Sequence, residues 1–361
     1  MSRPGLVRLG ERLARWALHN QLPVKWLVKP TIYQHFCGGE NLQEVMPVID
    51  RLGKHGIRTI LDYGVEAKET EPELEQTASF LIRTLEAAAA DEDVHIISTK
   101  LTGLFQDILL EKVTAGETLT ATEQADYERG RSRLRRISEA AHAAGVGLHI
   151  DAEESWKQGA IDQLAWEMSA LFNHDKPIII NAVQLYRTDR LEFLRQSLED
   201  ARRHGYLCAV KLVRGAYMEK ERARATQLRY PSPIHATLEA THAAYNQALR
   251  FCLDNLGEMY VCNATHNEAS CRLQVQLMAE RNIRPTHPLV ATAQLYGMSD
   301  NLSFNMARHG YNVEKYLPYG PVREVIPYLI RRTQENTSVG GQMSRELNLL
   351  SREMKRRGLV G

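Results

Sequence analysis

The chain has 361 residues, and 43% of them are hydrophobic, which is enough for a large buried core. Its length suggests about two domains, but single α/β barrels reach about 250 residues, so the domain count stays open. The formal net charge is +1, from 45 basic and 44 acidic side chains, so no field of one sign would concentrate nucleic acid. The cysteines are scattered and form no CxxC pair, which favours a reducing compartment, and we expect a cytoplasmic protein. They are Cys37, Cys208, Cys252, Cys262 and Cys271.

Both ends of the chain are basic and amphipathic. Residues 1–20 carry arginines with leucines and a tryptophan between them, but they lack the long apolar core and small-residue cleavage site of a secretory signal. We predict a helix docked on the surface, with a transit peptide as the alternative. No run of about 18 apolar residues occurs, so no membrane span is predicted. Residues 1–55 are predicted to be an N-terminal helical segment, 56–340 a catalytic domain and 341–361 an amphipathic helical tail.

Short apolar runs rich in β-branched residues recur along the chain, and most are continuous rather than alternating. Continuous runs are typical of parallel strands whose two faces are both buried. Helical patterns such as 71–90 and 187–205 lie between them, and the second ends with basic residues and a glycine. Residues 104–130 are a longer polar insertion whose second half begins a helix. The predicted strands are residues 57–63, 94–101, 147–153, 177–186, 207–213, 259–265, 288–295 and, more weakly, 311–319.

This alternation of strands and helices predicts a closed parallel (βα)8 barrel, often called a TIM barrel. The alternative is an open, doubly wound sheet, which usually holds fewer strands and binds dinucleotides through a GxGxxG motif after its first strand. The first predicted strand instead runs into DYGVEAKE, and neither GxGxxG nor GxxxxGK[ST] occurs in the chain. A nucleotide cofactor would therefore have to be held in another way.

Polar side chains stand at the ends of the predicted strands, where a parallel barrel carries its catalytic groups. Buried charges are costly unless paired, so Lys100 and Asp151 form either a structural ion pair or a substrate-binding pair. His266 is either a site residue or a packed, helix-capping histidine. No metal site is predicted, because Cys262 and His266 have no second ligand pair at suitable spacing. The strand-end residues are Asp62, Glu66, Lys100, Asp151, Glu153, Asn181, Gln184, Lys211, Arg214, Thr265, His266, Asn267, Gln294 and Tyr316.

The stretch YLIRRTQEN, residues 328–336, places Tyr328, Arg331, Arg332 and Glu335 on one face of a helix. The two guanidinium groups can converge on one anion, and a guanidinium matches a carboxylate through two parallel hydrogen bonds. Glu335 can hold one arginine in place. The alternative is a surface helix with ordinary arginine–glutamate pairs, but the apolar residues that flank the motif favour a packed helix. A small carboxylic acid is therefore a candidate ligand.

Several blocks resemble the signatures of the proline dehydrogenase family, and they occur in the family's order between about residues 31 and 340. They are ISTKL (97–101), HIDAEES (149–155), VKLVRGAYMEKERARA (210–225), NATHNE (263–268), QLYGMSD (294–300) and YLIRRTQEN. The stretch KYLPYGPVREVIPYLIRRTQEN is most similar to the single-domain, mitochondrial-type branch. The resemblance implies a distorted (βα)8 barrel with FAD over the strand ends. It also implies that the last helix, about 322–337, lies over the barrel mouth instead of beside the eighth strand.

The resemblance also assigns roles to individual residues. Arg331, Arg332 and Lys100 would grip the carboxylate of proline, and Tyr328, Tyr316 and Leu295 would pack around its ring. The catalytic residues would be Asp151, Lys211 and Arg214. The flavin contacts would be Ala152, Gln184, Lys211, Arg214, Gly215, Ala216, Thr265, His266, Asn267 and Glu335.

Two positions distinguish branches of this family. Many bacterial members have an arginine beside flavin N5 where this chain has Lys211, and a lysine supplies a cation and a donor but lacks the planar fork. Hydroxyproline-preferring relatives have a small residue where this chain has Tyr316, so the resemblance favours proline as substrate.

The resemblance therefore implies an FAD-dependent proline dehydrogenase. Hydride transfer from ring C5 to flavin N5 would give 1-pyrroline-5-carboxylate, which a separate dehydrogenase would oxidise further. Electrons would pass to a quinone, through a peripheral contact with an inner membrane made by segments 3–17 and 344–357. The alternatives are a hydroxyproline dehydrogenase of the same fold, a Schiff-base lyase that uses Lys100 or Lys211, and a non-catalytic binding protein.

Overall fold

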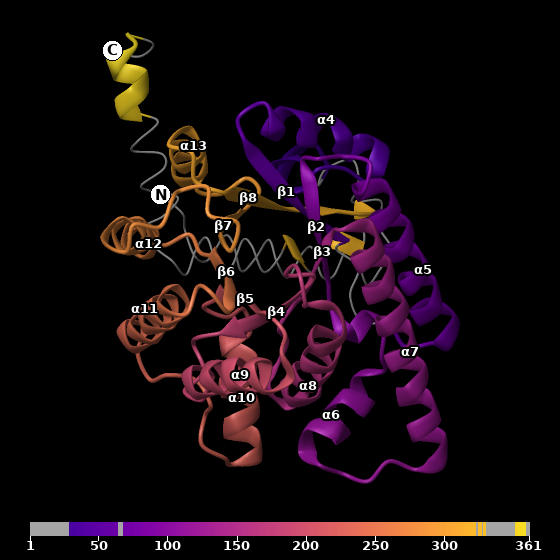
Figure 1. Ribbon diagram of the computed structural model, residues 1–361. Helices are drawn as coiled ribbons and strands as arrows, with labels where there is room; N and C mark the ends of the chain where they lie inside the picture. Colours follow the sequence, from indigo (N-terminus) through magenta and orange to yellow (C-terminus); the bar gives the residue numbers. More distant parts are fainter. Residues whose placement is uncertain (1–28, 64–67, 323, 327, 330–350, 359–361) are drawn as a thin grey trace.

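The computed structural model of the protein describes residues 29–63, 68–322, 324–326, 328–329 and 351–358. Within this part, eight strands close into a barrel in chain order, and each strand is parallel to its neighbours (Figure 1). Strand β1 closes the barrel against β8, with Ile60 opposite Tyr316. The strands are β1 (Ile57–Tyr63), β2 (Val94–Thr99), β3 (Gly147–Ile150), β4 (Ile179–Gln184), β5 (Cys208–Val213), β6 (Met259–Ala264), β7 (Val290–Leu295) and β8 (Val313–Tyr319).

Helices surround the barrel and follow one another in chain order (Figure 1). They are α5 (Glu71–Ala88), α6 (Asp107–Ala115), α7 (Ala121–Ala144), α8 (Ser155–Phe172), α9 (Arg190–His204), α10 (Met218–Leu228), α11 (Leu238–Asp254), α12 (Glu268–Glu280) and α13 (Asp300–Arg308). Their ends follow local sequence signals. A capping box of Thr120 and Glu123 begins α7, and left-handed glycines end α7 and α9. The predicted barrel and all eight predicted strands are confirmed.

Alternate strand residues fill the inside of the barrel, as the two-residue period of a strand requires. Ile60, Ile96, Ile180 and Tyr260 belong to this inner cluster. The remaining strand residues face the helices and form larger apolar clusters with them. These side chains fill the interior of the barrel. The polar strand ends above them therefore form the base of a concave site.

The polar insertion folds into a helical extension of the barrel wall. Helix α6 is followed by α7, which begins at Ala121. This confirms the prediction that a helix begins in the second half of the insertion. The hydroxyl of Thr114 in α6 accepts a hydrogen bond of 2.9 Å from the backbone N–H of Ala160 in α8. A short 3-10 turn, η2 (Leu101–Gly103), connects β2 to this extension. Because the turn begins directly after Lys100, it helps to set the position of the Lys100 backbone.

The described N-terminal residues form a π-helical turn η1 (Lys29–Tyr33), a short helix α3 (Gln34–Phe36) and helix α4 (Leu42–Gly53). The Tyr33 hydroxyl donates to Gly320 O at 2.8 Å, beyond the end of β8. Tyr33 also packs with Val325 and Tyr328, which belong to the helical stretch after β8. No helix among the described residues is long and apolar enough to cross a membrane.

Candidate active site

A cavity of about 390 Å3 opens at the C-terminal ends of the strands. Every residue that the sequence assigned to the site and that the structure describes lines it. These are Lys100, Asp151, Ala152, Gln184, Lys211, Arg214, Gly215, Ala216, Thr265, His266, Asn267, Leu295, Tyr316 and Tyr328. Arg331, Arg332 and Glu335 lie outside the described residues. Tyr328 reaches the cavity from the helical stretch after β8, which places the described part of that helix at the barrel mouth.

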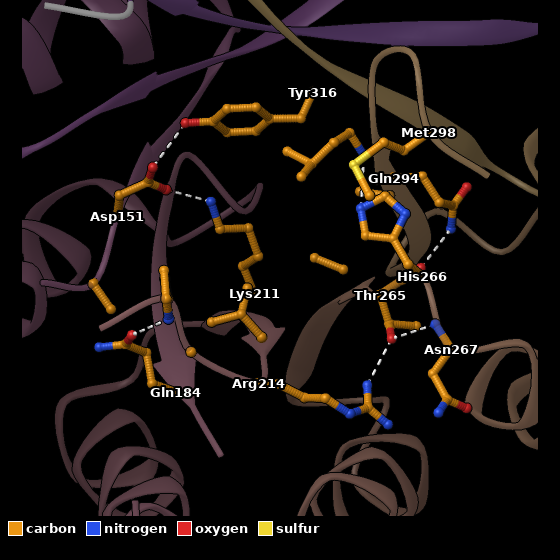
Figure 2. A pocket seen from close by; sticks show the side chains of 18 of the residues that line it. Asp151, Gln184, Lys211, Arg214, Thr265, His266, Asn267, Gln294, Met298 and Tyr316 are labelled. Carbon is orange, nitrogen blue, oxygen red and sulfur yellow. Dashed lines mark hydrogen bonds and ion pairs between the residues drawn. The ribbon is translucent and has the colours of Figure 1, made fainter. Parts of the chain in front are cut away.

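Asp151 is the centre of an ion cluster on the cavity floor (Figure 2). Lys211 in β5 donates a hydrogen bond to its Oδ1, and the Tyr316 hydroxyl in β8 donates to its Oδ2 at 2.8 Å. The Lys100 ammonium lies 3.8 Å from the same Oδ2. Burial alone would raise the pKa of Asp151, but the ammonium groups of Lys211 and Lys100 hold it well below its usual range. The carboxylate is therefore ionised at neutral pH and a weak base.

Tyr316 covers this cluster from one side. Its ring centroid lies 5.2 Å from the Lys211 ammonium, a cation–π distance. Burial and the negative charge of Asp151 raise the pKa of the Tyr316 phenol well above its usual range, so the hydroxyl keeps its proton. The ring is thus fixed by its hydroxyl at one end and by the backbone of β8 at the other.

Arg214 forms a second cationic group just beyond the end of β5. Its Nε donates to His242 Nδ1 at 2.9 Å, its Nη1 to Thr265 Oγ1 at 2.6 Å and its Nη2 to Ser270 Oγ at 3.0 Å. The guanidinium lies 4.2 Å from the centroid of the Tyr245 ring. Among the described residues, no carboxylate forms an ion pair with Arg214.

Burial lowers the pKa of Arg214 from its ordinary value, because its charge has only neutral acceptors around it. Even a partly buried cation without a counter-ion is costly, so this arrangement fits an anionic ligand that occupies the same cavity. The diphosphate of a dinucleotide such as FAD has that charge, and guanidinium groups bind phosphate oxygens well.

The backbone that follows Arg214 also lines the cavity, through Gly215 and Ala216. Gly215 has a φ of 135°, and a Cβ there would lie 2.5 Å from the Tyr186 ring, so only glycine allows this close approach. The next N–H, of Ala216, donates to Gln184 Oε1 at 3.4 Å. Gln184 in turn donates to Glu153 O at 2.7 Å. These contacts connect the ends of β3, β4 and β5 beneath the cavity.

The wall after β6 and β7 has a different organisation. The hydroxyl of Thr265 accepts from the backbone N–H of Asn267 at 3.0 Å as well as from Arg214. Asn267 Oδ1 accepts from Ser270 N at 3.0 Å and caps α12, so its side chain has a structural use as well as a place in the wall. His266 Nδ1 lies 2.9 Å from Ser299 Oγ, which connects this wall to the loop after β7.

Some lining residues were not assigned by the sequence. His242 and Leu238 come from α11, and Met298 comes from the loop after β7. Positions 238 and 242 lie four apart at the start of a helix, so the periodicity placed them on one face but gave no sign that this face meets the cavity. Three strand-end residues, Asp62, Glu153 and Asn181, do not line the cavity. The Asn181 amide, for example, donates to Asp162 Oδ1 in α8.

The sequence also resembles known proteins. The sequence profile of the family described as proline dehydrogenase matches residues 45–345. "Proline dehydrogenase 1, mitochondrial" of Dictyostelium discoideum is 32% identical over 379 aligned residues, which cover 93% of this chain and 66% of that protein. The hydroxyproline dehydrogenase of Xenopus laevis is 34% identical over 392 aligned residues, which cover 98% of this chain and 84% of that protein.

A solved structure has the same fold. It is proline utilization A from Bdellovibrio bacteriovorus, inactivated by N-propargylglycine, with a TM-score of 0.78 and 22% identity. The match covers 86% of this chain and 33% of that chain, so this chain spans about a third of the solved protein and just under two thirds of the Dictyostelium relative. The profile match over most of the sequence shows that the chain belongs to the proline dehydrogenase family, whose members are oxidoreductases that act on the CH–NH group of proline.

Proposed function

We propose that this protein is an FAD-dependent proline dehydrogenase that converts L-proline into 1-pyrroline-5-carboxylate. The observation that supports it best is Arg214, a partly buried guanidinium on the cavity wall that has three neutral hydrogen-bond acceptors and no carboxylate among the described residues. In this proposal the diphosphate of FAD supplies the missing negative charge. Gly215, Ala216 and Gln184 hold the adjoining part of the cofactor.

The protein supplies binding and orientation. FAD, when bound, accepts the hydride that leaves the ring carbon next to the proline nitrogen. Lys100 binds the substrate carboxylate together with Arg331 and Arg332, and Tyr316 and Leu295 pack against the ring. Asp151 remains ionised, so it holds the lysines and orients the amine rather than acting as a strong base.

The absorbance spectrum of the purified protein tests this proposal. We expect a yellow protein whose flavin absorbance is bleached by proline under anaerobic conditions. Arg331→Ala and Arg332→Ala should each raise the KM for proline strongly with a smaller change in kcat, because they remove binding rather than chemistry. A protein that takes up no FAD, or whose bound flavin proline does not reduce, would contradict the proposal.

A hydroxyproline dehydrogenase is the second candidate, because a relative of that name aligns with 98% of this chain. Tyr316 argues for proline, since its ring lies over the floor of the cavity and its hydroxyl is committed to Asp151. A Schiff-base lyase is less well supported. The nucleophile of such an enzyme is an amine that is free to attack a carbonyl, whereas the amine of Lys211 is held against the Asp151 carboxylate.

We propose further that the electrons pass to a quinone, at a membrane that the protein contacts peripherally. The relatives named mitochondrial are consistent with the periphery of an inner membrane, in place of a free cytoplasmic enzyme. The basic tail is one candidate contact, and its described residues 351–358 are helical at the start and mostly exposed. Flotation with anionic liposomes should recover the full chain, and less of a variant that lacks 341–361. Equal recovery of both would exclude the tail.

The product needs a further reaction. We propose that a separate dehydrogenase oxidises 1-pyrroline-5-carboxylate.

A further inference from the structure

Glu153 is a buried acidic residue next to the cavity that has no role in the reaction as proposed so far. It follows the end of β3, only 3% of its surface is exposed, and it does not line the cavity. Its Oε1 accepts from the backbone N–H of Thr102 at 3.1 Å, and its Oε2 accepts from the Thr102 hydroxyl at 2.7 Å. Both carboxylate oxygens of Glu153 therefore accept hydrogen bonds from the same residue, Thr102, which follows β2.

Thr102 is the middle residue of η2, the turn that begins directly after Lys100. The turn closes through the backbone bond from Gly103 N to Lys100 O at 3.0 Å. The position of the Lys100 backbone therefore depends on this turn, and the turn is held to the end of β3 by the Glu153 carboxylate. This attachment joins the segment that follows β2 to the segment that follows β3.

The backbone of Glu153 is held equally firmly. Its N–H donates to Gln158 Oε1 in α8 at 2.8 Å, and its carbonyl accepts from Gln184 in β4 at 2.7 Å. Gln184 also accepts from Ala216 N, beyond β5. One residue thus connects the turn after β2 with the ends of β3 and β4, and through Gln184 with the cofactor side of the cavity.

This position is electrostatically unfavourable for an acid. Burial raises the pKa of Glu153 to about 7, and the charges of Lys157 and Lys100 offset this only in part. No ion pair to Glu153 is formed among the described residues. A buried acid at this energetic cost indicates a use other than stability.

We propose that Glu153 is a positioning residue, which fixes the Lys100 turn so that the Lys100 ammonium meets the carboxylate of the substrate. The proposal rests on the proposed function, in which Lys100 binds that carboxylate. Glu153 itself touches neither substrate nor cofactor.

The experiment compares four variants of the flavin-loaded protein. Glu153→Ala removes both acceptors, whereas Glu153→Gln keeps one oxygen for the Thr102 N–H and offers an amide donor to the hydroxyl. Thr102→Val removes only the hydroxyl donor and keeps the shape of the side chain. Glu154→Gln is the matched control, because this neighbouring carboxylate is also buried but pairs with Lys157 and Lys220 rather than with the turn.

The binding probe is cyclopentanecarboxylate, which has the ring and carboxylate of proline but no amine to oxidise. Loss of a buried acceptor for a backbone N–H should weaken probe binding about tenfold in Glu153→Ala, and loss of the hydroxyl about threefold in Thr102→Val. Glu153→Gln should restore the affinity to within about twofold of wild type, and Glu154→Gln should not change it. The KM for proline should follow the same order, with kcat at saturation and flavin content changed much less.

Hydrogen exchange gives a readout that needs no ligand. The Thr102 amide should be protected in wild type and in Glu153→Gln, and should exchange faster in Glu153→Ala. If Glu153→Ala does not fold, the probe affinity of Thr102→Val takes its place in the comparison. Wild-type affinity for the probe in Glu153→Ala, or in Thr102→Val where that variant stands in, would overturn the proposal. A wild-type protein that binds neither FAD nor the probe would instead contradict the proposed function.

Discussion

Two cations lie at the C-terminal end of strand β5, one within the strand and one directly after it, and their surroundings differ in one respect. Lys211 lies on the cavity floor against the carboxylate of Asp151. Arg214, three residues later, has acceptors from His242, Thr265 and Ser270, all of them neutral. The first cation therefore has a counter-ion within the protein, and among the described residues the second has none.

The comparison separates the two functions of the cavity. A buried ion pair fixes geometry and changes little when a ligand arrives, which suits the end where a small substrate must be oriented. A partly buried guanidinium that has only neutral acceptors gains most of its electrostatic stabilisation when an anion binds, which suits a cofactor diphosphate. One strand thus serves both ends, and substitutions on it should affect them separately.

The largest expected effect is that of Arg214→Met. Removal of the guanidinium should weaken FAD binding at least about a hundredfold, because two or more charge-assisted hydrogen bonds are lost, and the protein should purify without colour. The ratio of flavin absorbance to protein absorbance measures this directly. Arg224→Met is the control, since Arg224 lies on α10, pairs with Glu111 and stacks 4.5 Å from the Trp156 ring, away from the cavity. A yellow Arg214→Met protein would remove the distinction between the two cations.

The next effect is that of Lys211→Met, which leaves Asp151 without its nearest cation. The pKa of Asp151 should rise, and kcat/KM for proline should fall about a hundredfold, because a buried carboxylate loses its partner at the catalytic floor. Flavin content should stay near that of wild type, since Arg214 is unchanged. Reconstitution followed by steady-state kinetics checks both quantities. Loss of flavin from this variant would mean that the two cations share one function.

A smaller effect is expected for Tyr316→Ser, which opens space beside the substrate ring. The preference for hydroxyproline over proline, as the ratio of the two kcat/KM values, should rise about tenfold or more. Tyr316→Phe separates volume from hydrogen bonding, because it keeps the ring and loses only the bonds of the hydroxyl to Asp151 and Ser98. It should lower both activities without changing their ratio. An unchanged ratio in Tyr316→Ser would exclude Tyr316 as the residue that sets this preference.

The sequence predicted the barrel and most of the described site for a physical reason. Strands buried on both faces leave continuous apolar runs, and the polar residues that end them meet at one rim. The positions at which strands end were predicted less accurately. The run 147–153 contains a strand that stops at Ile150, and beyond it the side chain of Asp151 lies in the cavity while that of Glu153 holds the turn after β2.

Partners across the barrel were harder to predict than members of the site. Lys100 and Asp151 were expected to pair because they end neighbouring strands, and their charged groups are 3.8 Å apart. Lys211, from a strand that is not adjacent to β3, makes the closer contact because its side chain points across the barrel interior. His242 could not be found from strand ends at all, since it reaches the cavity from a helix. The arginine clamp, which the sequence motif marked most clearly, lies outside the described residues and stays a prediction.

The smallest effect concerns His242, which must be neutral at Nδ1 to accept from Arg214. Burial and the charge of Arg214 lower its pKa below the ordinary value of 6.5. A group whose pKa is lower in the folded state contributes stability that is present above its unfolded pKa and is lost as the pH falls through the lowered folded value. The melting temperature of the flavin-free protein should therefore fall below about pH 6.5, and His242→Gln, which accepts at every pH, should lose part of that dependence. His142→Gln, an exposed histidine of α7, should keep the wild-type profile. Identical profiles for His242→Gln and wild type would show that the neutral acceptor beside Arg214 contributes nothing measurable, and the contrast between the two cations of β5 would then rest on Thr265 and Ser270 alone.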